Sequence, residues 1–180
     1  MIQAYAYGVL IAAASAVVVV GQGMLLAGAV VNLGSMGVVL VAVLYFVGDN
    51  LLGYYMISRD LGIVNTIAGV VFQNMYLIAP VALVSAFILK QDYSVFRILK
   101  VTASVLGLAF AWFWGDHMSA LVSLRSTEKY PISVVMYQAS HAQGTDAGKL
   151  TAILYILVPI LVAGACIVIS SSERGEREAA

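Results

Sequence analysis

Residues 1–48 decide the fold: they read MIQAYAYGVLIAAASAVVVVGQGMLLAGAVVNLGSMGVVLVAVLYFVG and contain no Lys, Arg, Asp, Glu or His. A transmembrane helix needs about 20 consecutive apolar residues to cross the hydrocarbon core of a bilayer. The stretch is long enough for two such helices, and Asn-Leu-Gly-Ser at 32–35 marks the turn between them. Because the first 20 residues lack the basic start of a secretory signal, we expect a retained helix here.

The composition of the whole chain extends this conclusion. Of its 180 residues, 62% are hydrophobic and 10% are charged, whereas about 25% of residues are charged in soluble domains. This composition predicts an all-α integral membrane protein. The formal net charge is zero, so no excess of basic residues predicts nucleic-acid binding.

The apolar runs predict about five transmembrane helices in a single domain over residues 1–170, followed by a short charged tail at 171–180. The expected spans are approximately 4–31, 36–58, 61–89, 98–121 and 150–170. Pro80 offers a bending point in the third span, because a proline removes one backbone donor and crowds the preceding turn.

The polar connection before the last span contains a short amphipathic segment. Ile132, Val135, Met136 and Ala139 follow the i, i+3, i+4, i+7 spacing of one helix face. We therefore expect a helix at about 131–143, lying on the membrane surface or against a partner.

The basic residues suggest an orientation. Five spans place Lys90, Arg97, Lys100, Arg174 and Arg177 at one end, and Arg59, Arg125, Lys129 and Lys149 at the other. Short loops rich in Lys and Arg stay on the cytoplasmic side. The compact cluster at 90–100 favours a cytoplasmic C-terminus in an inner, or cytoplasmic, membrane.

A polar layer is predicted near the middle of the membrane. Asp49 and Asn50 fall near the centre of the second span, Gln73 and Asn74 near the centre of the third, and Gln22 past the centre of the first. An intramembrane carboxylate costs about 2.5–3.5 kcal/mol on insertion scales, so it marks a candidate functional site.

Two interpretations of this layer stay open. No Lys or Arg within the first three spans neutralises Asp49, so it must be protonated, bind a cation, face water or meet a partner subunit. These residues are then candidates for an ion or proton pathway. In the other interpretation, the Asn and Gln side chains are interhelical hydrogen-bonding groups that hold the helices together.

A second candidate site is the run Trp112-Phe113-Trp114-Gly115-Asp116-His117. Aromatic rings gather at membrane–water interfaces, which would put Asp116 and His117 near water, where an imidazole changes charge close to neutral pH. The alternative is an interfacial belt that ends in two solvated polar residues. His117 and His141 have no metal-ligand spacing, so we expect neither a metal nor a cofactor.

Small residues four apart predict close helix packing. Ala12 with Ala16, and Gly23 with Ala27, have this spacing in the first span, and small residues let membrane helices approach closely. A further small cluster occurs at 163–165 in the last span.

These features favour a small multi-span subunit of a larger membrane assembly, with a structural or scaffolding role in a secretion, respiratory or viral membrane complex. Its expected partners are other membrane subunits, lipid and further copies of this chain. The alternative is a proton- or cation-conducting channel or transporter subunit that uses Asp49. The chain carries no nucleophile elbow, phosphate loop, zinc-protease or dinucleotide motif, so we do not expect an enzyme.

Overall fold

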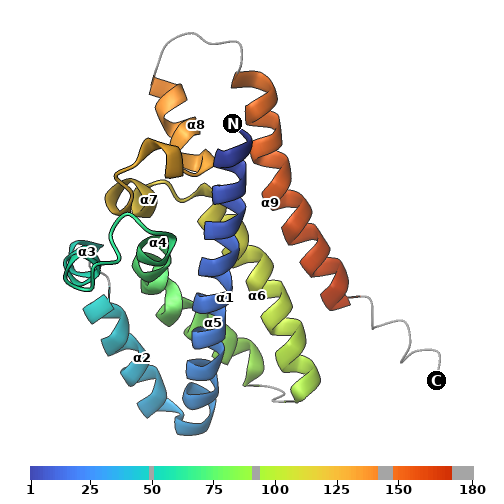
Figure 1. The fold of residues 1–180 in the computed structure, drawn as a ribbon. Helices are drawn as coiled ribbons and strands as arrows, with labels where there is room; N and C mark the ends of the chain where they lie inside the picture. The colour runs from blue at the N-terminus through green and yellow to red at the C-terminus, as the bar shows by residue number, and fades with distance from the viewer. Residues whose placement is uncertain (49–50, 91–93, 142–147, 172–180) are drawn as a thin grey trace.

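The computed structural model describes residues 1–48, 51–90, 94–141 and 148–171 (Figure 1). Within these ranges the chain is helical and has no strand, which confirms the all-α class. Four described segments are long and apolar enough to cross a membrane: α1 (Ile2–Leu33), Ile67–Leu89, α6 (Val95–Gly115) and the Thr151–Val168 part of α9 (Gly148–Ser171). The protein is therefore an integral membrane protein, and its span number is near the predicted five.

The centre of the bundle is α1. At 1.5 Å per residue its 32 residues extend about 48 Å, longer than a hydrocarbon core of about 30 Å. It packs most extensively against α5 (Ile78–Leu89) and α6, which flank it in Figure 1. Gly34, with φ 57°, ends α1 by donating its N–H to the Val30 carbonyl, and the chain turns back into α2 (Ser35–Gly48).

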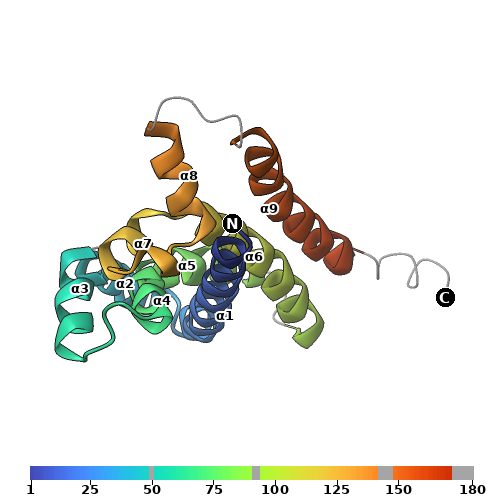
Figure 2. The same ribbon diagram turned by 45° about the horizontal axis from the view of Figure 1, so that its top comes forward.

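The predicted span at 36–58 becomes two helices. They are α2 and α3 (Leu51–Asp60), on either side of residues 49–50, which lie outside the described residues. Figure 1 shows α2 from the side but α3 almost end-on, and Figure 2 shows α3 from the side, so the two helices run in different directions. At 14 residues, α2 extends only about 21 Å.

The third predicted span starts six residues later than expected. Residues 61–66 form a turn in which Gly62 and Asn65 have φ values of 70° and 65°, and Thr66 caps the helix that follows. The span then comprises α4 (Ile67–Gln73), the 3₁₀ segment η1 (Asn74–Leu77) and α5. Pro80 has no N–H for the Tyr76 carbonyl, so the break in α-helical bonding comes just before the predicted bending point.

After α6 the chain forms α7 (Met118–Ser123), η2 (Thr127–Lys129) and α8 (Ile132–His141). The amphipathic segment is thus helical, with residues 142–143 of its predicted range outside the described part. Ile132 and Val134 in its first turn are fully buried, because this end of α8 packs against α1 and α7. Ala139, further along the predicted apolar face, is exposed.

Candidate functional site

A polar cluster lies between α1 and the broken third span. Ser15, near the middle of α1, is fully buried together with Gln73 at the end of α4 and Asn74 at the start of η1. The Asn74 amide donates a hydrogen bond from Nδ2 to Ser15 Oγ over 2.8 Å. Two predicted residues therefore belong to one site, and Ser15 is a member that the sequence analysis missed.

Some polar atoms of the cluster have no hydrogen-bond partner in the part of the chain that the structure describes. Both amide atoms of Gln73, and Oδ1 of Asn74, are buried and have no hydrogen-bond partner among the described residues. A buried polar group without a partner costs about 1–3 kcal/mol. The same residues stand at the change from α-helix to 3₁₀-helix, and such segments within a helix often mark hinges or functional sites.

The other residues of the predicted polar layer do not belong to this cluster as the structure describes it. Gln22 is exposed and lines an outward-facing groove of about 400 Å³ with Tyr54 of α3 and Tyr76 of η1. Asp49 and Asn50 lie outside the described residues. The helices that flank them, α2 and α3, contact η1 and α4 respectively.

The Asp116–His117 pair is engaged in local structure. Asp116 Oδ1 accepts hydrogen bonds from the N–H groups of Met118 (3.0 Å) and Ser119 (3.4 Å), which stabilises the start of α7. The His117 ring stacks on Tyr137 of α8, with 4.4 Å between ring centroids and 18° between planes. Oδ1 of the carboxylate and the imidazole are thus engaged in separate local contacts, whereas Oδ2 of Asp116 is buried and has no partner among the described residues.

The aromatic run before this pair is divided between core and surface. Trp112 is 60% exposed, whereas Trp114 is 2% exposed, because helical residues two positions apart point about 200° apart, to nearly opposite sides. Trp114 stacks between Phe110 and Tyr155, at 5.9 Å from each ring, and its Nε1 donates to the Tyr155 carbonyl over 2.8 Å. Of the expected aromatic belt, Trp112 is the ring that faces outward.

Small residues form the closest helix contacts. Ala12, Ala16, Gly23 and Ala27 are all buried, as their spacing predicts. A Cβ atom at Gly23 would lie 2.5 Å from Cγ1 of Val81 on α5. A similarly close approach joins α6 to the small cluster predicted at 163–165: a Cβ at Gly107, which the sequence analysis did not identify, would lie 3.3 Å from the Cα of Ala163 and 2.7 Å from the Cβ of Cys166.

A hydrogen-bonded loop junction was also missed. Asn65 Oδ1 accepts from the N–H groups of Arg125 (3.0 Å) and Ser126 (3.1 Å), and the Asn65 carbonyl accepts from Lys129 Nζ over 2.9 Å. Asparagine tolerates a positive φ better than most residues, which is the one local signal in the sequence. The junction ties the loop before α4 to the loop after α7.

No cluster of three or more His, Cys, Asp or Glu that would hold a metal occurs in the part of the chain that the structure describes. Comparison with known proteins adds no assignment, because no family model, no curated protein and no solved structure matches this chain.

Proposed function

We propose that this chain is a non-enzymatic integral membrane subunit of a larger assembly, in which it holds membrane helices of partner chains in place. The observation that supports this proposal is the openness of α9. Only 6% of the residues in its membrane window are buried, against 39% in α1. Figure 2 shows α9 at the edge of the bundle beside α6, and Tyr5 of α1 reaches it with a hydrogen bond to the Thr151 carbonyl.

The outward side of α9 has the small residues that partner helices use. A Cβ at Gly164 would meet nothing within 4 Å, and Ala165 is exposed. Leu161 and Val168, one turn away on either side, are also exposed. Close approach of membrane helices depends on small residues at the contact, so this side of α9 suits a transmembrane helix of a partner.

We further propose that the protein resides in a cytoplasmic membrane with its C-terminus on the cytoplasmic side. Lys90, Arg97 and Lys100 flank the α5–α6 connection at one end of the bundle, and clustered basic residues favour the cytoplasmic face. The partners are other membrane subunits or further copies of this chain, together with lipid.

Native purification in mild detergent tests the proposal. We expect the wild-type chain to co-purify with partner chains, and Gly164→Leu to fold normally but lose them, because leucine fills the contact. Gly21→Leu is the matched control, since Gly21 on α1 also has nothing within 4 Å of its Cβ position. A wild-type chain that leaves its native membrane as a stable monomer would contradict the proposal.

The alternative is a proton- or cation-conducting subunit. The amide of Gln73 and the Oδ1 atom of Asn74, which have no partner among the described residues, favour it, since broken helices with exposed backbone and polar groups line the binding sites of many transporters. Asp49 would then supply the carboxylate. Reconstituted wild-type protein should conduct, and Asp49→Asn should assemble but lose the flux; flux that survives in the variant would remove this alternative.

A further inference from the structure

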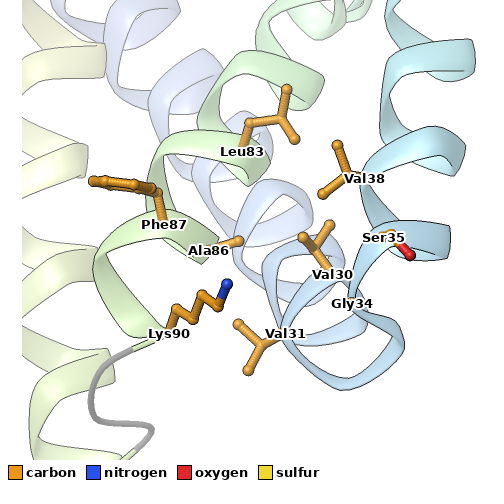
Figure 3. Close-up of a pocket in the computed structure, with 9 residues that line it drawn as sticks. All are labelled: Val30, Val31, Gly34, Ser35, Val38, Leu83, Ala86, Phe87 and Lys90. Atoms are coloured by element: carbon orange, nitrogen blue, oxygen red, sulfur yellow. The ribbon is translucent and has the colours of Figure 1, made fainter.

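A lipid-facing groove opens at the end of the bundle where α1 turns into α2. It has a volume of about 440 Å³ and is formed by the last turn of α1, the first turn of α2 and the last turns of α5 (Figure 3). Its walls are apolar, with Val30, Val38, Leu83 and Phe87 among its lining residues. Phe87 is 80% exposed, so the groove is accessible from the surrounding hydrocarbon.

One cation stands at the polar end of this groove. Lys90 follows the last residue of α5, and Figure 3 shows its ammonium group pointing into the groove beside Val31 and Ala86. An ammonium group on a flexible stem recognises phosphate as a point charge. The groove thus pairs an apolar slot with a single positive charge at the level where α5 ends.

The charges around Lys90 reinforce this polarity. Residues 90–100 hold three basic side chains and one acidic side chain, a formal charge of +2. Lys90 is the basic residue that lines the groove. The Lys100 ammonium instead lies over the ring of Phe96, 5.2 Å from the ring centroid. Basic pockets between transmembrane helices attract anionic lipid headgroups.

We propose that this groove binds one anionic phospholipid, with the headgroup phosphate at the Lys90 ammonium and an acyl chain against Val38, Leu83 and Phe87. A phospholipid has an anionic headgroup attached to hydrocarbon chains. The groove likewise has a cation at one end, Lys90, and apolar residues along its walls. A water-soluble anion would use the lysine but leave the apolar walls without an occupant. This inference does not depend on the proposed subunit role.

Lipid titration followed by native mass spectrometry tests the site. The protein, purified in mild detergent with any partners retained, is titrated with phosphatidylglycerol and with phosphatidylcholine of the same acyl chains. We expect one phosphatidylglycerol to bind about fivefold more tightly, the effect of one basic residue near an anionic group. Lys90→Gln should remove this preference, whereas Lys100→Gln, a cation outside the groove, should keep it.

Two further experiments distinguish a bound lipid from other ligands. Val38→Phe places a larger side chain in the slot at a position that is already 46% exposed, and it should weaken binding of both lipids while the helical circular dichroism is unchanged. Sodium phosphate at millimolar concentration should not displace the phosphatidylglycerol. Equal affinity of wild-type protein for the two lipids, equal behaviour of the two lysine variants, or displacement by phosphate would overturn the proposal.

Discussion

The two helices α1 and α9 have similar hydrophobicity but opposite environments. Both are long apolar segments, yet α1 is enclosed by α5 and α6, while α9 contacts mainly α6 and leaves most of its surface open. Lipid tails are as apolar as leucine, so hydrophobicity alone does not decide which membrane helix becomes central. The enclosed helix is the one that carries buried Gly, Ala and Ser residues along most of its length, whereas α9 makes its close contact with α6 around Ala163 and Cys166.

The largest effect is expected from filling the closest contact of α1. Gly23→Leu puts a side chain where even a Cβ would lie 2.5 Å from Val81, and overpacking of this kind costs about 1–3 kcal/mol, occasionally more. The free energy of unfolding, measured by denaturant titration in detergent micelles, should fall by that amount. Gly21→Leu, two residues away and facing open space, should leave it unchanged; equal losses in both variants would refute the close-packing explanation.

A smaller effect is expected at the contact between α6 and α9. Gly107→Leu would clash with Cys166, but the Cys166 end of α9 can move outward, because the contacts of α9 with α8 and with Tyr5 of α1 lie toward its Thr151 end. We therefore expect the rest of the bundle to remain folded while α9 separates from α6. Cys166 is half-buried in the native bundle, so its labelling by a membrane-permeant maleimide should become faster; an unchanged labelling rate would mean that the two helices stay together.

The smallest effect on stability is expected at the polar cluster. Gln73→Met keeps the length of the side chain and removes two buried amide atoms that have no partner among the described residues. Replacing such groups with an apolar side chain is neutral or stabilising, by about 1 kcal/mol. A large loss of stability on denaturant titration would instead reveal a hydrogen-bonded partner for Gln73, and loss of flux alone would favour the conducting alternative.

The sequence predicted the membrane class and the packing side of α1, because long apolar runs and small residues four apart have direct physical consequences. It did not predict where the third span begins. Residues 61–64 are as apolar as a helix interior, and the turn there depends on the positive φ of Gly62 and Asn65. Hydropathy carries no signal for backbone conformation, so the predicted boundary was placed too early.

The polar site was predictable only in part. Depth along each span identified Gln73 and Asn74, which do share a buried site, but it also grouped them with Gln22, which faces a different groove. The partner of Asn74 is Ser15, and that pairing depends on the rotation of α1 against η1. The burial of Trp114 has the same origin, because only its position around α6 distinguishes it from Trp112.

The open side of α9 is tested most directly by site-specific photo-cross-linking in native membranes. A photoreactive phenylalanine analogue at Leu161, a large side chain exposed one turn from Gly164, should give a discrete cross-linked product with another protein chain, identifiable by mass spectrometry. Gly164→Leu in the same background should abolish that product. Cross-links to lipid alone at Leu161 would contradict the proposal that α9 binds a partner helix.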